Sequence, residues 1–491
     1  MDYFPEEVIE NIVSFLPDAG LSSFAVISSK WQHPVEKRTF SRLRINGDAE
    51  TRRSFLSYVL STSRAYRRTY LRTIEFYVNL PWPRDEQHLS NTYTTHIRRL
   101  FQLLALGDNL DARDKDKKRT GGREGITLEL ALLSLEPTIP QPSINVPDLS
   151  EEEVSQPLLD SFILSGGLDL TDVDQQLSEV KCVSRLVHRI VHPHLGRARY
   201  ESRSISSKAV TTLVNRLPRL RYLDIIANVE HDDYNAEMDS FLLFIRTGLM
   251  KALLAADYLS DHQPMEVSIL LDKRIGPRGM NRLRGNQYLE HLMGPVLRAL
   301  SQTSLSFNVC GVFGPSLFWP EFSEPSGVML AKPERRWSQL RNLHVKLMNW
   351  SSNGQPYSES GTASDDANVP IEDRVQALFK SWSKALDAMP LIEQATVKWS
   401  LTFDTPEGNT ERDWLVAYQA PGTTLDRDRY AWEGYVTADM RRYPRLVFQN
   451  NHGWRPHTLT MRRLRKIQKE RYSTEKMIEL DVENLDNVTQ S

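Results

Sequence analysis

The sequence predicts a mixed protein of helices and strands (α+β or α/β), with an N-terminal unit of three short helices followed by an irregular, degenerate α/β solenoid. Residues 1–45 place apolar side chains at helical spacing only. The remainder changes repeatedly from the helical period of about 3.6 residues to the strand period of about 2. The chain has 491 residues, which is too long for one simple core and suggests several domains.

Three short helices are expected within residues 1–45. Pro5 favours the start of the first, because the N–H that proline lacks would be unpaired in a first turn. The segment 17–20 breaks the chain before a second helix, and Ser28-Ser29 is expected to offer a cap for a third helix that carries Trp31. Helices this short cannot bury all their apolar surface among themselves, so we expect part of it to contact another protein.

This segment resembles an F-box. The first half reads Phe4-Pro5-x-Glu7-Val8-Ile9-x-x-Ile12, where the family usually has Leu-Pro and then aliphatic residues. The second half reads Leu21-x-x-Phe24-Ala25-Val26-Ile27-Ser28-x-Lys30-Trp31, with serine, lysine and tryptophan in the family's order. Phe4 departs from the usual leucine but keeps an apolar anchor. The alternative is a helical hairpin that packs wholly inside this protein.

The resemblance implies that the segment docks on a Skp1-type adaptor subunit of a ubiquitin ligase and, through it, joins a cullin. The remainder of the chain would then bind a protein target that the sequence does not identify. The contacts implied for the Skp1-type subunit are Pro5, Ile9, Leu16, Leu21, Phe24, Val26 and Trp31.

Beyond the F-box-like segment, a helix followed by a short break and a strand recurs along the chain. The clearest strand pattern is Leu217-x-x-Leu220-x-x-Leu223-x-Ile225, and similar patterns span 337–347 and 392–399. Weaker copies span 71–78 and 305–309. Each helix and strand of such a unit leaves one apolar face, which neighbouring units bury by stacking. This predicts a parallel sheet on one side and helices on the other.

That arrangement is leucine-rich-repeat-like, but the spacing between units is irregular and longer than the usual repeat of about 20–29 residues. We therefore expect a degenerate solenoid, with a compact α/β domain as the alternative. The predicted organisation is an F-box at 1–45, linker helices and first repeat-like units at 46–135, a proline-rich linker or loop at 136–155, a degenerate leucine-rich-repeat-like target-binding region at 156–460, and a charged C-terminal tail helix at 461–491.

The C-terminal half adds a weaker resemblance, to the F-box proteins abundant in filamentous fungi. Asp387-Ala388-Met389-Pro390, between a helix and a strand, and the stretch 414–422 carry it. Neither motif brings catalytic residues with it. Three polar stretches, 111–125, 136–153 and 351–370, interrupt the pattern and are expected to be surface loops or links.

Composition argues against several classes of function. The formal net charge of −2 gives no long-range field to attract nucleic acid or an anionic membrane. Two cysteines, Cys182 and Cys310, in so long a chain predict a reducing compartment. The first residues lack the basic start and apolar core of a signal peptide, and no apolar run approaches the roughly 20 residues that span a bilayer. We expect a soluble protein of the cytoplasm, the nucleus or both.

The histidines His188, His192 and His194, with Cys182 upstream, raise the question of a zinc site. In a helix, His188 and His192 would share one face as ligands require, but Cys182 would lie on roughly the opposite side. Pro193 would end such a helix and leave His194 unconstrained. Ordinary, partly exposed histidines are the preferred interpretation, and neither a metal nor a cofactor is predicted.

Catalytic motifs are missing from the sequence: it contains no Gly-x-Ser-x-Gly, no His-Glu-x-x-His and no phosphate-binding Gly-x-x-x-x-Gly-Lys. Cys310 falls in a strand-like alternation and is expected to be buried and inert. The acidic pairs Asp232-Asp233 and Asp365-Asp366 lie in polar stretches typical of solvated loops. The chain is not predicted to be an enzyme.

A basic run at 462–469 could serve in nuclear localisation or nucleic-acid binding. The acidic residues that follow, Glu475 and Glu479 among them, could neutralise it. A solvated tail helix with Leu464 and Ile467 packed against the protein is the simpler interpretation.

The leading functional hypothesis is a target-binding adaptor of a Skp1–cullin–F-box ubiquitin ligase. Two alternatives belong to other classes: an F-box scaffold that binds a Skp1-type subunit but acts outside the ligase, and an unrecognised enzyme in the C-terminal region. Recovery of a cullin in the same complex would separate the first alternative from the ligase adaptor, and a deep pocket with convergent titratable groups would favour the second.

Overall fold

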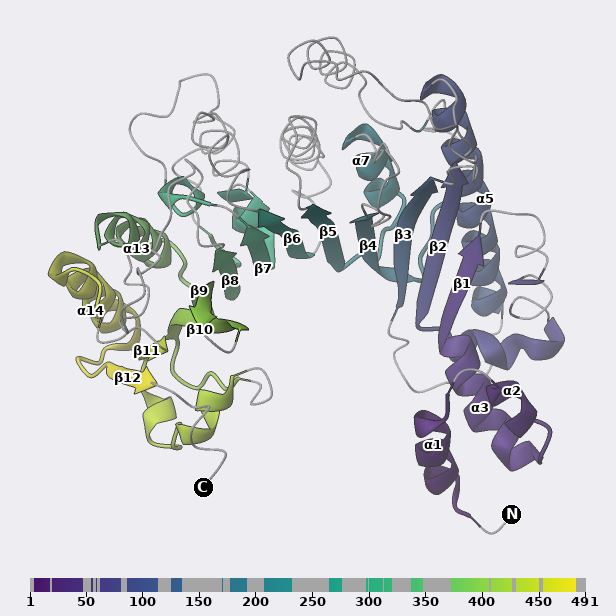
Figure 1. Ribbon diagram of the computed structural model, residues 1–491, viewed down its shortest axis with the longest axis horizontal. Coiled ribbons are helices and arrows are strands. Elements are labelled where there is room, and N and C mark those ends of the chain that lie inside the picture. Colours follow the sequence, from purple (N-terminus) through teal and green to yellow (C-terminus); the bar gives the residue numbers. More distant parts are fainter. Residues whose placement is uncertain are drawn as a thin grey trace. The chain divides into compact units, whose positions relative to one another are not determined.

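A computed structural model of the chain divides into two compact units, Met1–Val154 with Leu164–Ile226 and Ser155–Ile163 with Ala227–Ser491 (Figure 1). It describes residues 4–17, 20–46, 54–55, 59, 62–80, 86–113, 125–134, 170, 177–191, 207–231, 265–275, 297–298, 300–311, 313–319, 337–347, 372–405, 408–425, 430–449 and 454–482. The expected polar stretches at 136–153 and 351–370, and most of 111–125, lie outside these residues. None of the described helices is both long and apolar enough to cross a membrane.

The first unit begins with the three short helices that the sequence predicts, and its strands follow. The helices are α1 (Glu6–Phe15), α2 (Leu21–Phe24) and α3 (Ser29–Ser41). The next elements are β1 (Arg42–Asn46), the 3-10 helix η2 (Thr62–Thr69), β2 (Thr73–Leu80), α5 (Glu86–Arg113), β3 (Ile126–Ser134), β4 (Val183–Val191), α7 (Ser207–Asn215) and β5 (Tyr222–His231), whose first half belongs to this unit. Of the two serines expected to offer a cap, Ser28 stands at the N-cap of α3, although its side chain makes no capping hydrogen bond, and Ser29 is the first residue of the helix.

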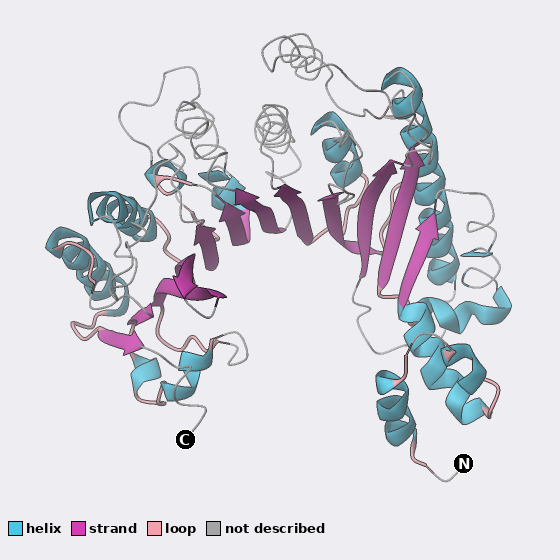
Figure 2. Cartoon of the chain, viewed as in Figure 1, coloured by secondary structure: helices cyan, strands magenta, loops and turns pink. Residues whose placement is uncertain are grey.

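In the first unit the strands lie side by side in chain order, β1-β2-β3-β4-β5. The pairs β1–β2, β2–β3 and β3–β4 are parallel. Parallel neighbours are joined by right-handed crossovers, so strands in chain order place all their crossovers on one face of the sheet. Figure 2 shows α5 and α7 on the same side of these strands. In the part of this unit that the structure describes, each strand therefore has one face toward helices and one face that the connecting helices leave uncovered.

The second unit combines parallel strands with a β-hairpin. Its elements are β6 (Met265–Ile275), β7 (Ser304–Gly311), the 3-10 helix η5 (Pro315–Leu317), β8 (Asn342–Leu347), α13 (Glu372–Asp387), β9 (Gln394–Thr405), β10 (Gly408–Gln419), the 3-10 helices η6 (Ala431–Tyr435) and η7 (Met440–Arg442), β11 (Arg445–Gln449), α14 (Thr458–Tyr472) and β12 (Ile478–Val482). The strands β6 to β9 are parallel in chain order, β9–β10–β11 are antiparallel, and β12 pairs parallel with β11.

The expected strand is confirmed at each of the five patterns, and the helix expected before it is confirmed at two. Strands β2, β5, β7, β8 and β9 begin within or next to the predicted segments, and α7 and α13 precede β5 and β9. The mixed α/β class and the mainly parallel pairing therefore agree with the sequence. In β8, Leu343, Val345 and Leu347 are buried, whereas Lys346 is exposed.

Aromatic side chains form the helix-side core of the second unit. Trp399 of β9 and Trp414 of β10 are partners in the register, and their ring centroids are 4.3 Å apart. Phe379 of α13 contacts both rings, and Trp454 stacks beside Phe379 with a centroid distance of 5.1 Å. Aromatic pairs at such distances add to the free energy gained by burial, which explains why β9, β10 and α13 form one compact body.

The C-terminal end of the second unit covers the other face of its sheet as well. Trp432 of η6 and Val436 pack on Leu415, Ala417 and Val447. The predicted tail helix at 461–491 is shorter than expected, because α14 ends at Tyr472 and the chain then adds strand β12. Leu464 and Ile467 are buried, as the sequence predicted.

A buried ion pair joins α3 to η2, the 3-10 helix that precedes β2 in the first unit. Glu36 of α3 accepts hydrogen bonds from Arg67 of η2, from Tyr66 Oη at 2.6 Å and from Gln32 Nε2 at 3.0 Å. Both ionic side chains are about nine-tenths buried. Burial raises the pKa of Glu36, but the hydrogen bonds from Arg67, Gln32 and Tyr66 outweigh it and lower the pKa from 4.5 to about 2.

At its C-terminal end, α3 passes into β1 without an intervening loop. Ser41 Oγ donates to the carbonyl of Arg38 at 2.7 Å, and the backbone N–H of Arg72 donates to the carbonyl of Ser41 at 2.8 Å. The end of α3 is thereby held against the start of β2. The helices are connected to the sheet through this junction and through the Glu36–Arg67 pair.

We expect Glu36→Gln to lower the free energy of unfolding by about 3 kcal/mol near pH 6, because it leaves the Arg67 charge buried without its partner. A carboxyl group with a lowered folded-state pKa stabilises the fold above its unfolded pKa, and this contribution is lost as the pH falls toward the folded value. The difference from wild type should therefore shrink to about 1.5 kcal/mol at pH 3. Urea unfolding of both proteins at both pH values, followed by circular dichroism, measures this difference in the free energy of unfolding.

The matched control is Glu393→Gln, which removes the carboxylate of the half-exposed pair Arg341–Glu393. A pair at the surface contributes about 0–1 kcal/mol, so this variant should unfold like wild type. A pH-independent difference between wild type and Glu36→Gln would contradict the ionic role of Glu36.

Candidate functional site: the N-terminal helices and the uncovered sheet faces

The three N-terminal helices bury a small core of their own. It contains Ile9 and Val13 of α1, Leu21 of α2, and Trp31 and Val35 of α3. Phe24 stacks on Trp31 with ring centroids 5.9 Å apart. The helices therefore form a packed unit, and this apolar cluster is not left bare.

The seven side chains expected to contact a Skp1-type subunit separate into two groups. Ile9, Leu21 and Trp31 lie inside the helical core and are at most 5% exposed. In this structure they act as packing residues, and their effect on a partner would pass through the shape of the unit. The other four reach the surface at least in part: Pro5 and Val26 are exposed, and Leu16 and Phe24 are half-buried.

The surface of this unit is nevertheless rich in apolar side chains. Five of the eleven large exposed hydrophobic residues that the structure describes fall between residues 4 and 27, and they are Phe4, Val8, Phe15, Val26 and Ile27. Phe15 is 87% exposed and Val26 is 85% exposed. We refer to these five residues as the apolar surface set. Apolar groups concentrated this way on a small unit are typical of a protein-binding surface.

Sequence reasoning included Val26 but missed the other four members of this set as contacts. Val8 and Phe15 are seven residues apart on α1 and therefore lie on the same side of the helix, beside the face that Ile9 and Val13 bury. The helical spacing could have distinguished the two sides. Only the packing of α2 and α3 decides which side is covered.

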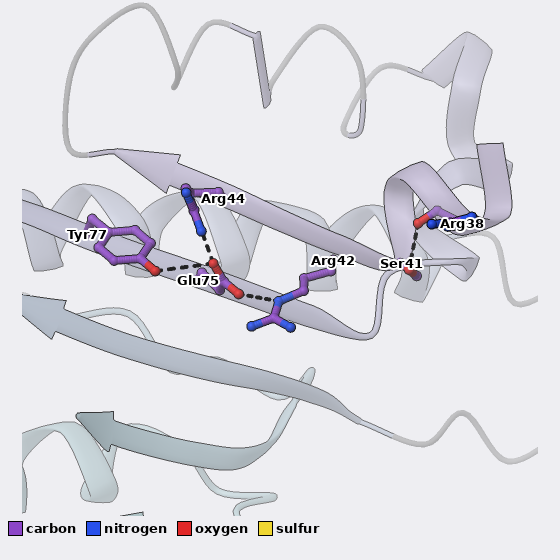
Figure 3. Close-up of polar contacts among 6 residues, drawn as sticks. All are labelled: Arg38, Ser41, Arg42, Arg44, Glu75 and Tyr77. Carbon is purple, nitrogen blue, oxygen red and sulfur yellow. Dashed lines mark hydrogen bonds and ion pairs between the residues drawn. The ribbon is translucent and has the colours of Figure 1, made fainter. Parts of the chain in front are cut away.

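On the uncovered face of the first unit, charged and aromatic side chains lie close together. Glu75 of β2 is buried and accepts hydrogen bonds from Arg42, from Arg44 at 3.2 Å and from Tyr77 at 3.3 Å (Figure 3). Burial raises the pKa of Glu75, but the hydrogen bonds from Arg42 and Arg44 outweigh it and hold the pKa below its ordinary value. Glu75 is therefore a carboxylate at neutral pH, and it orients both arginines.

A second pair of the same kind lies further along this face. Arg185 of β4 donates through Nε to the buried carboxylate of Asp224 in β5. The Arg185 guanidinium lies 5.9 Å from the ring centroid of Tyr222, and the Arg44 guanidinium lies 5.1 Å from that of Tyr77. Each buried acid thus anchors an exposed arginine that also contacts a tyrosine.

The corresponding face of the second unit is polar but has fewer ionic contacts. Strands β7, β8 and β9 bring together the half-buried or exposed side chains Ser306, Asn308, Asn342, His344, Lys346 and Lys398. Tyr430, which lies next to η6, reaches this face with its hydroxyl 3.4 Å from His344 Nδ1. Such a surface can donate and accept hydrogen bonds along several strands.

His188, the first of the histidines considered for a zinc site, does not lie on a helix. His188 is in strand β4 and is buried, and burial lowers its pKa from 6.5 to about 4. The expectation that it is partly exposed is therefore wrong, and the helical geometry assumed for His188 and His192 does not apply. His192 and His194 lie outside the described residues. Cys310 is buried in β7, in agreement with the sequence.

Among the described residues, Glu6, Glu10 and His33 bring possible metal-ligand atoms within 4.8 Å of one another. His33 Nδ1 lies 3.0 Å from Glu6, and Lys37 donates to Glu10 at 2.7 Å. These contacts join α1 to α3 at the protein surface.

The basic run on α14 is paired with acidic residues. Arg465 contacts Glu479 at 3.1 Å, and Lys469 contacts Glu475 at 2.6 Å. These are two of the acidic residues that the sequence suggested as neutralising partners. They neutralise Arg465 and Lys469 within the basic run, whose solvated role stays a prediction.

Comparisons with known proteins do not assign the chain. No protein-family model matches it, and no curated protein matches it.

Burial predicts different outcomes for two of the expected contact residues. Trp31→Ala should destabilise the helical unit by about 3–5 kcal/mol, because it empties the centre of a packed core. Val26→Ser changes an exposed side chain and should alter stability by less than about 0.5 kcal/mol. Hydrogen–deuterium exchange of the α1 and α3 amides measures the stability of the helical unit in each variant. Equal protection of α1 in wild type and Trp31→Ala would show that the indole does not support the helices.

Proposed function

We propose that this chain is a target-binding adaptor of a Skp1–cullin–F-box ubiquitin ligase, whose N-terminal helices dock on a Skp1-type subunit. The observation that carries the proposal is the apolar surface set on a helical unit that already buries its own core. The F-box resemblance of the same residues supports the identity of the partner. In this role the chain catalyses no reaction.

The exposure of Phe15 and Val26 supports docking on energetic grounds. Each leaves nearly all of its apolar surface in water, and burying such a side chain yields about 1.5–3 kcal/mol. A few residues of this kind supply most of the binding free energy of a typical interface. The four surface residues of the implied contact set, Pro5, Leu16, Phe24 and Val26, would complete the contact. Ile9, Leu21 and Trp31 would maintain its shape.

The connection of the helices to the sheet suits an adaptor. The direct passage of α3 into β1 and the buried Glu36–Arg67 pair restrict motion between the docking helices and the first strands. A ligase adaptor works by holding its target near the ubiquitin-loaded enzyme, that is, by raising an effective concentration. A rigid junction maintains that concentration better than a flexible linker does.

We further propose that the strand-bearing remainder is a degenerate leucine-rich-repeat-like solenoid that binds the target. Parallel strands in chain order support repetition, because each new unit adds one strand and places its helix on the same face. The uncovered polar faces would then be the target-binding surfaces. The irregular lengths between strands explain why the repeats are hard to recognise.

The test of docking is calorimetric titration of the full chain with a purified Skp1-type subunit. Phe15→Asp and Val26→Asp should each weaken binding by about tenfold or more, since each places a charge in an apolar contact. Leu459→Asp is the matched control, because Leu459 is an exposed apolar residue of α14, far from the N-terminal helices in sequence. It should bind like wild type.

Full affinity in both N-terminal variants would refute docking through these helices. If docking is lost as expected, affinity purification separates the two adaptor hypotheses. A ligase adaptor recovers a cullin together with the Skp1-type subunit, and the Phe15→Asp variant loses both. Recovery of the Skp1-type subunit without a cullin would instead favour the scaffold.

A further inference from the structure

Two arginines on the uncovered face of the first unit lie in one row across four strands. The register pairs Arg42 with Thr73, Thr73 with Thr127, and Thr127 with Arg185. Register partners in neighbouring strands point their side chains to the same face. The row therefore begins and ends with a guanidinium and has two threonine hydroxyl groups between. We refer to these four residues as the arginine row.

The two guanidinium groups are anchored in the same way. Arg42 donates through Nε to the buried carboxylate of Glu75, and Arg185 donates through Nε to that of Asp224. In the described part of the chain, both arginines donate to these acids through Nε and not through their terminal Nη atoms. In Figure 3 the dashed line from Arg42 to Glu75 starts at Nε, and no dashed line starts at either Nη atom. The Arg42 side chain is 64% exposed and that of Arg185 is 49% exposed.

Anchoring through Nε leaves the two Nη atoms of each arginine as a pair of donors facing solvent. A planar carboxylate can accept from both at once, which is the strongest contact that arginine makes. An exposed arginine normally loses side-chain entropy when it binds, and the buried acids and Tyr222 already restrict these side chains. The arginine row is therefore preorganised for anions.

The charge balance of this face supports an acidic occupant. Glu75 and Asp224 are buried beneath their arginines, so the exposed charges of these pairs are positive. Glu129 of β3, the register partner of Glu75, adds one half-buried carboxylate to the same face. Further exposed cations stand at the strand starts beside the row, namely Arg72, Lys181 and Arg221. Backbone hydrogen bonds from Arg72 to Ser41 and from Arg221 to Ser184 hold these strand starts together.

We propose that the arginine row binds an acidic segment of a protein target, with one carboxylate on Arg42 and another on Arg185. Arg42 and Arg185 are three strand spacings apart, or about 14 Å. An extended peptide advances about 3.3 Å per residue, so the two carboxylates belong to residues four apart. Thr73 and Thr127 hydrogen-bond the peptide between them.

A carboxylate fits this arrangement better than a phosphate. Sites for phosphorylated residues gather several arginines around one dianion. The two arginines of the row lie about 14 Å apart, so one dianion cannot contact both of them. Arg44 stands beside Arg42 and shares the carboxylate of Glu75 with it. An acidic target segment gives the proposed adaptor function a chemical class of target, and its role as a ligase target rests on that proposed function. Binding of the acidic peptide itself does not.

The experiment measures peptide binding to the full chain, without any Skp1-type subunit, by fluorescence anisotropy at low ionic strength. The probe is a labelled nine-residue Gly/Ser peptide with two glutamates four residues apart. Arg42→Gln and Arg185→Gln should each weaken binding by about tenfold. Arg341→Gln removes an exposed, carboxylate-paired arginine of the second unit and should have no effect.

Peptide variants test the spacing. A peptide with its glutamates two residues apart should bind several-fold more weakly, because only one carboxylate can reach an arginine. Replacing both glutamates with glutamine should abolish binding. Equal affinity for the two spacings, or no measurable binding of the four-residue spacing, would overturn the proposal. Tighter binding of a phosphoserine peptide than of the glutamate peptide would overturn the choice of a carboxylate.

Variants of the anchoring acids distinguish binding by preorganised arginines from attraction by net charge alone. Asp224→Asn and Glu75→Gln each remove a negative charge, so attraction by net charge alone predicts tighter binding of an acidic peptide. Loss of the anchor predicts weaker binding, by about threefold or more, and this is the result we expect. Circular dichroism confirms that each variant is folded. Tighter binding in a folded Asp224→Asn variant would refute the arginine row as a built site.

Discussion

The order of the strands is the constraint on which the rest of the structure depends. Parallel strands that follow one another in chain order send every right-handed crossover to the same face, so one side of each strand meets helices and the other does not. The alternation in β8, with Leu343 and Val345 buried and Lys346 exposed, shows the result in a single strand. For this reason the aromatic core of the second unit lies on a face that meets helices. The arginine row of the first unit lies on a face that the connecting helices leave uncovered.

The N-terminal helices follow a different principle. They have no sheet to cover, and their core is only large enough for five buried residues, among them Ile9 and Trp31. A unit this small keeps much of its apolar surface exposed. The buried Glu36–Arg67 pair then connects the unit to the first strands, at a place where loss of either partner would leave a buried charge. Stable attachment and an exposed apolar surface are the two properties that an adaptor requires.

Much of the fold was predictable because the spacing of apolar residues along the chain indicates where helices and strands form. Leucine patterns such as 217–225 and 337–347 predicted β5 and β8, and Leu464 and Ile467 predicted the buried side of α14. The prediction failed where local pattern is ambiguous. His188 was considered on a helix but lies in a strand, and the segment after Tyr472 adds strand β12 to the sheet. Short apolar runs fit either type of element until a neighbouring strand offers hydrogen bonds.

The sequence by itself determined where helices and strands form, that the N-terminal helices have more apolar surface than they can bury, and that the chain carries no familiar catalytic motif. The tertiary structure decided which side of α1 is covered, so that Ile9 packs inside while Val8 and Phe15 reach solvent. It also brought Arg42 and Arg185, 143 residues apart in the sequence, into one row above buried acids. Periodicity is a local property of the chain, whereas register and burial depend on partners that are distant in the sequence.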